Sequence, residues 1–110
     1  MLENKTFDKE IDGINIEIKV DYIEGLDKEA ILTIVFPENE LRSKGMTLNQ
    51  SFDYEVMSRI SEIPLDQFGG GSNGIKIIEV TGETWEEIDE TIEKYINSLS
   101  ISKFPKYRNF

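Results

Sequence analysis

The sequence predicts an α+β fold, in which an antiparallel sheet of about four strands packs helices on one face. Polar and apolar residues alternate on both sides of a strong turn signal at Asp12-Gly13. Two further apolar runs, 30–36 and 75–80, have the length of strands. Residues 84–99 have the apolar stripe of an amphipathic helix. The expected order is β-β-β-(α)-β-α within a single domain over residues 1–110.

The first two strands form a predicted hairpin around Asp12-Gly13, because both residue types tolerate positive φ. Pairing across this turn places Phe7 opposite Ile18, and it also places Asp8 opposite Glu17 at a small like-charge cost. The predicted inner face holds Phe7, Lys9, Ile11, Ile14, Ile16, Ile18, Val20 and Tyr22. We expect the other face of the hairpin to be polar and wet.

The third strand is predicted over residues 30–36, whose almost continuous apolar character suits a central strand covered on both faces. Pro37 ends it, since proline cannot donate to a strand ladder. Residues 38–45 are expected to be a polar connection.

Residues 46–65 carry two competing periodicities, because Phe52 and Val56 fit both a helical stripe and one face of a strand. We favour a strand-like entry over 46–48 followed by a helix over about 51–62, ended by Pro64. This middle helix would pack on the same face of the sheet as the C-terminal one.

A glycine-rich loop separates this region from the fourth strand, predicted over residues 75–80. The glycines are Gly69, Gly70, Gly71 and Gly74. Gly69 and Gly74 have the separation of a phosphate-binding loop, but Ile75 stands where its lysine should be and a strand follows. The loop is therefore expected to be mobile, with a binding lid as the alternative.

The C-terminal helix begins with a capping box, Thr84-Trp85-Glu86-Glu87. Its apolar stripe is predicted to hold Trp85, Ile88, Ile92, Tyr95, Ile96 and Leu99. The candidate partner-binding residues lie on its other side and are Glu86, Glu87, Asp89, Glu90 and Glu93. These acids form either a solvated face favoured by the helix dipole or a docking surface for a basic partner.

Residues 102–110 form a basic, aromatic C-terminal tail. The candidate docking residues in it are Phe104, Tyr107, Arg108 and Phe110. The simplest expectation is that the tail folds back on the acidic body, and the alternative is a docking arm for a partner.

Composition excludes several functions. The 110 residues include 22 acidic and 12 basic side chains, with a formal net charge of -10 and neither histidine nor cysteine. Disulfides, thiolate nucleophiles and zinc sites of the usual kind are therefore excluded, and direct nucleic-acid binding is disfavoured. We expect no catalytic residues, no metal site and no cofactor, so the protein is predicted not to be an enzyme. No stretch approaches the ~20 apolar residues of a membrane span, so we expect a cytoplasmic protein without membrane contact.

In size, charge and layout, the chain resembles small acidic α+β proteins of bacteria and their phages, such as toxin immunity proteins, inhibitors of nucleic-acid-binding enzymes and secretion chaperones. The resemblance rests on no motif and transfers no residue role. It implies a non-enzymatic protein that binds a basic protein partner. The alternative is a small-molecule-binding or regulatory domain with a pocket between sheet and helix near the glycine loop. Exposed strand edges also offer a surface for a homodimer.

Overall fold

The computed structural model describes residues 3–51, 53–63 and 74–103. In chain order its elements are β1 (Lys5–Ile11), β2 (Ile14–Glu24), β3 (Lys28–Phe36), α1 (Glu38–Ser43), β4 (Met46–Gln50), α2 (Tyr54–Met57), β5 (Ile60–Ile63), β6 (Gly74–Gly82), α3 (Trp85–Asn97) and β7 (Leu99–Lys103).

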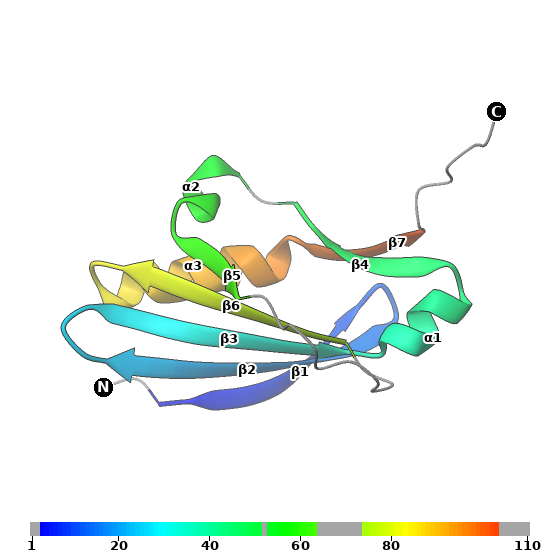
Figure 1. Cartoon of the computed structure of the whole chain (residues 1–110), viewed down its shortest axis with the longest axis horizontal. Coiled ribbons are helices and arrows are strands. Elements are labelled where there is room, and N and C mark those ends of the chain that lie inside the picture. Colours follow the sequence, from blue (N-terminus) through cyan, green and yellow to red (C-terminus); the bar gives the residue numbers. More distant parts are fainter. Residues whose placement is uncertain (1–2, 52, 64–73, 104–110) are drawn as a thin grey trace.

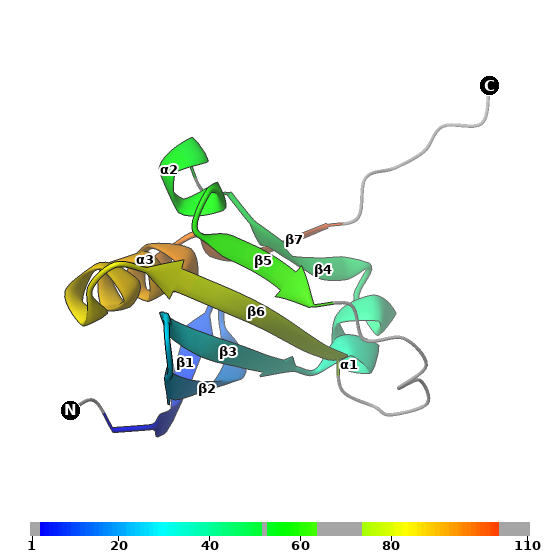
Figure 2. The same ribbon diagram turned by 60° about the vertical axis from the view of Figure 1, so that its left-hand side comes forward.

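The predicted α+β class is confirmed, although the described residues hold seven strands rather than about four. A five-stranded antiparallel sheet has the order β1-β2-β3-β6-β5, and a two-stranded sheet pairs β4 with β7. Figures 1 and 2 show α3 and the β4–β7 pair on the same side of the larger sheet. We call the side that they cover the inner face and the other side the outer face.

The N-terminal hairpin has the predicted register, with Phe7 opposite Ile18 and Asp8 opposite Glu17. Its two-residue turn has φ of 50° at Asp12 and 84° at Gly13, as the positive-φ turn requires. The Asp12 carboxylate also accepts a hydrogen bond from the backbone N–H of Ile101 at 2.9 Å. The same turn therefore closes the hairpin and links it to β7 through a hydrogen bond.

The core lies between the inner face and the elements that cover it. The most deeply buried strand residues, with no exposed area, are Ile16, Ile18, Val20, Ala30, Leu32, Ile34 and Val80. Ile88 and Tyr95 of α3 and Leu41 of α1 pack against these strand residues on the inner face. Each fully buried isoleucine or leucine contributes roughly 1.5–3 kcal/mol, so this layer supplies much of the stability.

The central position predicted for the third strand is confirmed, but the described residues cover one of its faces rather than the two that were predicted. β3 is the third of the five strands. Ala30, Leu32 and Ile34 are buried, whereas Ile31 and Val35 are only half-buried. Figures 1 and 2 show no described helix or strand on the outer face. The apolar run indicated a central strand without distinguishing one covered face from two.

The polar connection predicted over 38–45 contains the short helix α1, which buries Leu41. Two i,i+4 ion pairs brace it, Glu38–Arg42 at 3.2 Å and Glu40–Lys44 at 3.3 Å. The backbone N–H of Leu41 bonds to the Pro37 carbonyl, so the proline that ends β3 also begins the helix.

The strand-like entry predicted at 46–48 is confirmed as β4, but the helix predicted over 51–62 is wrong. Asp53 caps only the four-residue helix α2, of which Val56 alone is buried. The chain then enters β5, where Ile60 pairs with Val80 and Ile63 with Ile77. Pairing with β6 satisfies the backbone N–H and C=O groups along the edge of that strand. This pairing is favoured over a longer α2, because a longer helix would find little further apolar surface to bury.

The chain after α3 also departs from expectation. The helix ends at Asn97, so Leu99 lies not on its stripe but in β7, where it pairs with Gln50. Ser102 and Lys103, which were assigned to the tail, are the last residues of this strand. Residues 104–110 lie outside the described residues.

Gly74, which is predicted to belong to the mobile loop, is instead the first residue of β6, where it allows a close approach between neighbouring strands. It lies opposite Phe36 in the β3–β6 register and is buried. A Cβ on Gly74 would overlap the Phe36 ring, with Cε2 only 2.6 Å away, and would lie 3.1 Å from the Glu38 carboxylate. The aromatic ring therefore occupies the space that a side chain at Gly74 would need.

We predict that Gly74→Ala lowers the free energy of unfolding by about 1–3 kcal/mol, because the added methyl group forces the Phe36 ring out of its place. Urea unfolding followed by Trp85 fluorescence measures this. Gly25→Ala is the matched control, since a Cβ there meets only a backbone oxygen at 3.9 Å. It should change stability by less than about 0.5 kcal/mol. Equal effects of the two substitutions would contradict the prediction.

Candidate functional site

The predicted start of the C-terminal helix is confirmed. The Thr84 hydroxyl accepts a hydrogen bond from the backbone N–H of Glu87 at 3.1 Å, as an N-cap requires. Ile88, Ile92, Tyr95 and Ile96 turn inward from α3, so the acidic residues between them are held at defined angles around the helix.

Two of the five predicted helix acids contact side chains outside α3. Glu87 lies 3.4 Å from the Arg59 guanidinium, which joins α3 to the segment between α2 and β5. Asp89 accepts a hydrogen bond from the Tyr22 hydroxyl at 2.5 Å, which joins α3 to β2. Both carboxylates are half-buried. They hold the helix on the sheet and are poorly placed to meet a partner.

The other three acids share one solvent-facing stripe. Glu86, Glu90 and Glu93 are spaced i, i+4 and i+7, and all three are exposed. Glu90 lies 3.3 Å from Lys94, which offsets part of its charge. The structure therefore keeps a narrower acidic stripe than the five-residue surface that the sequence predicted.

Tyr22 and Trp85 were assigned to apolar surfaces, but the sequence did not show that they meet. Their rings pack edge to face, with centroids 5.8 Å apart and an interplanar angle of 88°. Burial, and next the hydrogen bond and charge of Asp89, raise the pKa of Tyr22 well above its usual value. Burial, and next the charge of Glu62, raise the pKa of Tyr95 to about 12. These neutral phenols belong to the packing between helix and sheet.

A larger acidic surface lies on the outer face of the five-stranded sheet. The strand registers place six acidic side chains there within the described residues: Asp8, Glu10, Glu17, Asp21, Glu29 and Glu79. Lys19 is the only basic side chain of the described strands on this face, and it lies 3.8 Å from Asp21. The basic strand residues Lys9 and Lys76 belong to the opposite face. Strand alternation thus makes the outer face predominantly acidic.

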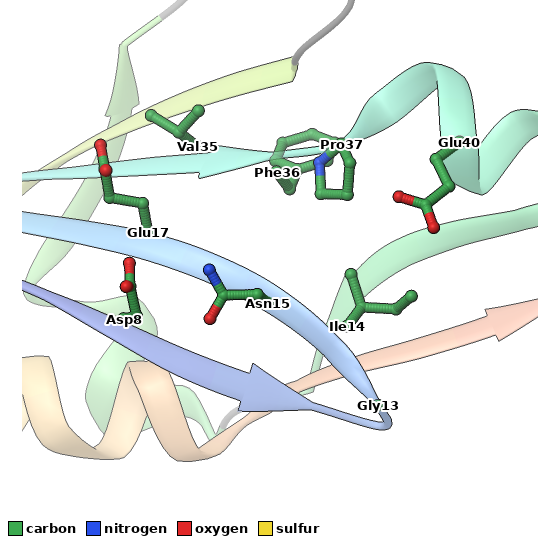
Figure 3. A pocket seen from close by; sticks show the side chains of 9 residues that line it. All are labelled: Asp8, Gly13, Ile14, Asn15, Glu17, Val35, Phe36, Pro37 and Glu40. Carbon is green, nitrogen blue, oxygen red and sulfur yellow. The ribbon is translucent and has the colours of Figure 1, made fainter.

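One end of this face is hollowed, beside the hairpin turn and α1 (Figure 3). The depression measures about 440 Å³. Asp8, Asn15, Glu17 and Glu40 supply its polar groups, and it is bounded on the apolar side by Ile14, Val35, Phe36 and Pro37. We call it the carboxylate hollow. In Figure 3 the carboxylates of Asp8 and Glu17 point to the same side of the sheet, as expected of directly paired residues.

The carboxylate hollow is suited to an organic cation. Asp8 and Glu17 are exposed like charges on paired strands, and in the described part of the chain neither forms an ion pair. A cation between them would relieve their repulsion. No three acidic side chains among the described residues lie close enough to hold a metal ion. A guanidinium or ammonium group, which spans a wider spacing through several N–H donors, matches the arrangement better.

Other predicted sites lie elsewhere or outside the description. Phe104, Tyr107, Arg108 and Phe110 of the tail, and the glycines at 69, 70 and 71, fall in undescribed segments. The Phe36 ring occupies the space beside Gly74 where a side chain would lie. The pocket expected near the glycine loop stays a prediction, because residues 64–73 lie outside the described ranges. A second depression, of about 460 Å³, lies between β1 and α3, with Phe7 and Ile92 among its lining residues.

None of the helices in the described ranges has the length and hydropathy that a bilayer span requires. Comparison with protein-family models, with curated proteins and with solved structures finds no match to the chain.

We predict that stability declines at alkaline pH more steeply in the wild type than in Tyr22→Phe. Because the folded-state pKa of Tyr22 is raised, the unfolded chain loses its proton first. The stabilisation is complete below pH ~10 and is lost as pH rises further, at up to ~1.4 kcal/mol per pH unit for one group.

Urea unfolding of both proteins between pH 7 and 11.5 measures this difference. The comparison at pH 7 is the control, because it isolates the loss of the hydrogen bond to Asp89, which is typically worth about 1–3 kcal/mol for a charged acceptor. The difference between the two proteins in the slope of unfolding free energy against pH above pH 10 then reports the ionisation of Tyr22. Parallel pH profiles would contradict the prediction.

Proposed function

We propose that the protein is a non-enzymatic interaction protein that binds a basic protein partner, in the manner of an inhibitor, an immunity protein or a chaperone. The observation that carries the proposal is the charge of the outer face, where six acidic side chains of the described strands accompany Lys19 alone. Such a surface attracts cationic partners, speeds their association and repels anionic competitors.

The acids of the fold divide into two groups, which supports the proposal. Glu87 and Asp89 hold α3 in place through Arg59 and Tyr22. The carboxylates of Asp8 and Glu17 have no such role in the described structure, and the strand register holds them side by side at a like-charge cost. A binding function accounts for this second group, because a partner's cations would offset the repulsion.

We predict that the protein retains a basic protein from an extract of its native host at 0.1 M salt and releases it at 1 M salt. The Debye length falls from about 10 Å to about 3 Å over this range, so an electrostatic complex weakens strongly. The retained protein, once purified, should bind at least ~10-fold more weakly at the higher salt concentration in calorimetric titration.

The control column carries an unrelated acidic protein of the same net charge, which removes proteins held by ion exchange alone. A specifically retained partner whose affinity does not depend on salt would contradict the proposal. So would the absence of any basic protein beyond those held by the control column.

A further inference from the structure

We infer that the outer face of the five-stranded sheet is the docking site and that its occupant is a basic amphipathic helix of the partner protein. The inference rests on the proposed function, and it specifies where the partner binds and which kind of segment it presents. Three features of the outer face carry it: a strip of exposed and half-buried apolar residues, acids at its margins and the carboxylate hollow at its end.

The apolar strip consists of Ile31, Val35, Ile63, Ile75 and Ile77. The registers join four of its members in two pairs, since Val35 lies opposite Ile75 and Ile63 lies opposite Ile77. Ile31 lies on the same face of β3, two residues beyond Thr33. Ile75 is 45% exposed and Ile63 is 37% exposed. Contiguous apolar residues on a sheet face, unlike single exposed ones, indicate a surface that another element covers.

Acidic residues adjoin the apolar strip. In the cross-strand register, Glu17 lies opposite Val35, and Glu79 lies opposite Ile31. The row continues from Glu17 to Asp8, so an apolar end and an acidic end lie on one line across the sheet. A partner that matches this line needs apolar side chains with lysine or arginine beside them.

The carboxylate hollow continues the apolar strip and shares Val35 with it. A long cationic side chain could lie with its aliphatic stem over Val35 and its charged group between Asp8 and Glu17. Glu40 approaches the same hollow from α1 (Figure 3). The surface therefore offers an apolar contact and a site for a cation at adjacent points.

A helix fits this surface better than an extended segment does. An extended segment joins a sheet at its edge through backbone hydrogen bonds, whereas a sheet face packs against a helix or against another sheet. From Ile31 to Val35 the strip runs about 13 Å along β3. A helix of about ten residues spans about 15 Å and presents an apolar stripe with cations beside it.

A second copy of this chain is disfavoured as the occupant. Each copy has a formal net charge of -10, and its outer face holds six described acids with a single lysine. Packing two such faces together would bring Glu17 and Glu79 of each copy toward carboxylates of the other. Like charges in an interface cost several kcal/mol, so charge selects a cationic occupant over another copy.

The test uses the full chain and a synthetic 14-residue leucine–lysine peptide designed as an amphipathic helix. Its control has the same composition in a shuffled order that removes the apolar stripe. Isoleucine methyl NMR at 0.1 M salt locates binding, because Ile31, Ile63, Ile75 and Ile77 lie in the strip while Ile18 and Ile34 lie in the core. We expect the largest shifts at the four strip methyls, and at least ~10-fold weaker binding of the shuffled peptide.

Paired variants test the two parts of the surface. Ile75→Thr with Ile77→Thr removes the apolar strip and keeps β-branched residues in β6, and Leu26→Thr is its control at a fully exposed apolar position in the β2–β3 loop. Asp8→Asn with Glu17→Gln removes two charges from the outer face. Its control, Glu86→Gln with Glu93→Gln, removes two charges from the α3 stripe.

We expect at least ~10-fold weaker peptide binding in both test variants and less than ~2-fold change in both controls. Urea unfolding identifies any variant that is damaged in folding. For such a variant, the methyl shifts of the wild type decide the question.

Four results would overturn the inference. Shifts and losses confined to the α3 stripe would do so while leaving the proposed function intact, because a basic partner would then bind elsewhere. Equal affinity for the two peptides would show that the surface does not recognise an amphipathic helix. Strip methyls that shift with the protein's own concentration would identify a second copy as the occupant. Strip methyls shielded from a soluble paramagnetic agent in the free protein would show that the chain itself covers the face.

Discussion

The register of β2 against β3 is the constraint on which the rest of the structure depends. It places Val20 opposite Leu32 and Ile18 opposite Ile34, and β6 extends the row by placing Ile78 opposite Leu32. All five side chains are at most 1% exposed. Because side chains alternate along a strand, a slip of one residue would turn the whole set to solvent and leave α3 without a surface to pack on.

The same register determines what the outer face presents. Each buried residue has neighbours on the same strand that point the other way, so the arrangement that buries Leu32 and Ile78 also brings Thr33 beside Ile77. The alternation also places Lys9 and Lys76 on the inner side and the six described carboxylates on the outer side. The candidate docking surface is therefore not an addition to the fold. It is the reverse side of the arrangement that makes the core.

The sequence predicted those parts of the fold that are set by local pattern. The Asp12-Gly13 turn fixes the hairpin register, and Thr84 begins α3 where the capping box indicates. The pattern did not reveal β5 or β7, because these short strands owe their existence to partners distant in the chain, Ile60 to Val80 and Leu99 to Gln50. For the same reason the acids of α3 looked equivalent in sequence, and only the fold separates Asp89, held by Tyr22, from the exposed stripe.

The acids around the apolar strip have a second physical consequence. An apolar strip on an uncovered sheet face favours self-association, and charges beside the strip oppose that association. In the proposed docking, Glu17 and Glu79 would oppose contact between copies of the chain and attract a cationic helix. The two effects have opposite signs for the two occupants, so the same few charges would both oppose self-association and select the proposed partner. The proposed partner would also account for Asp8 beside Glu17, a local repulsion that packing alone gives no reason to keep.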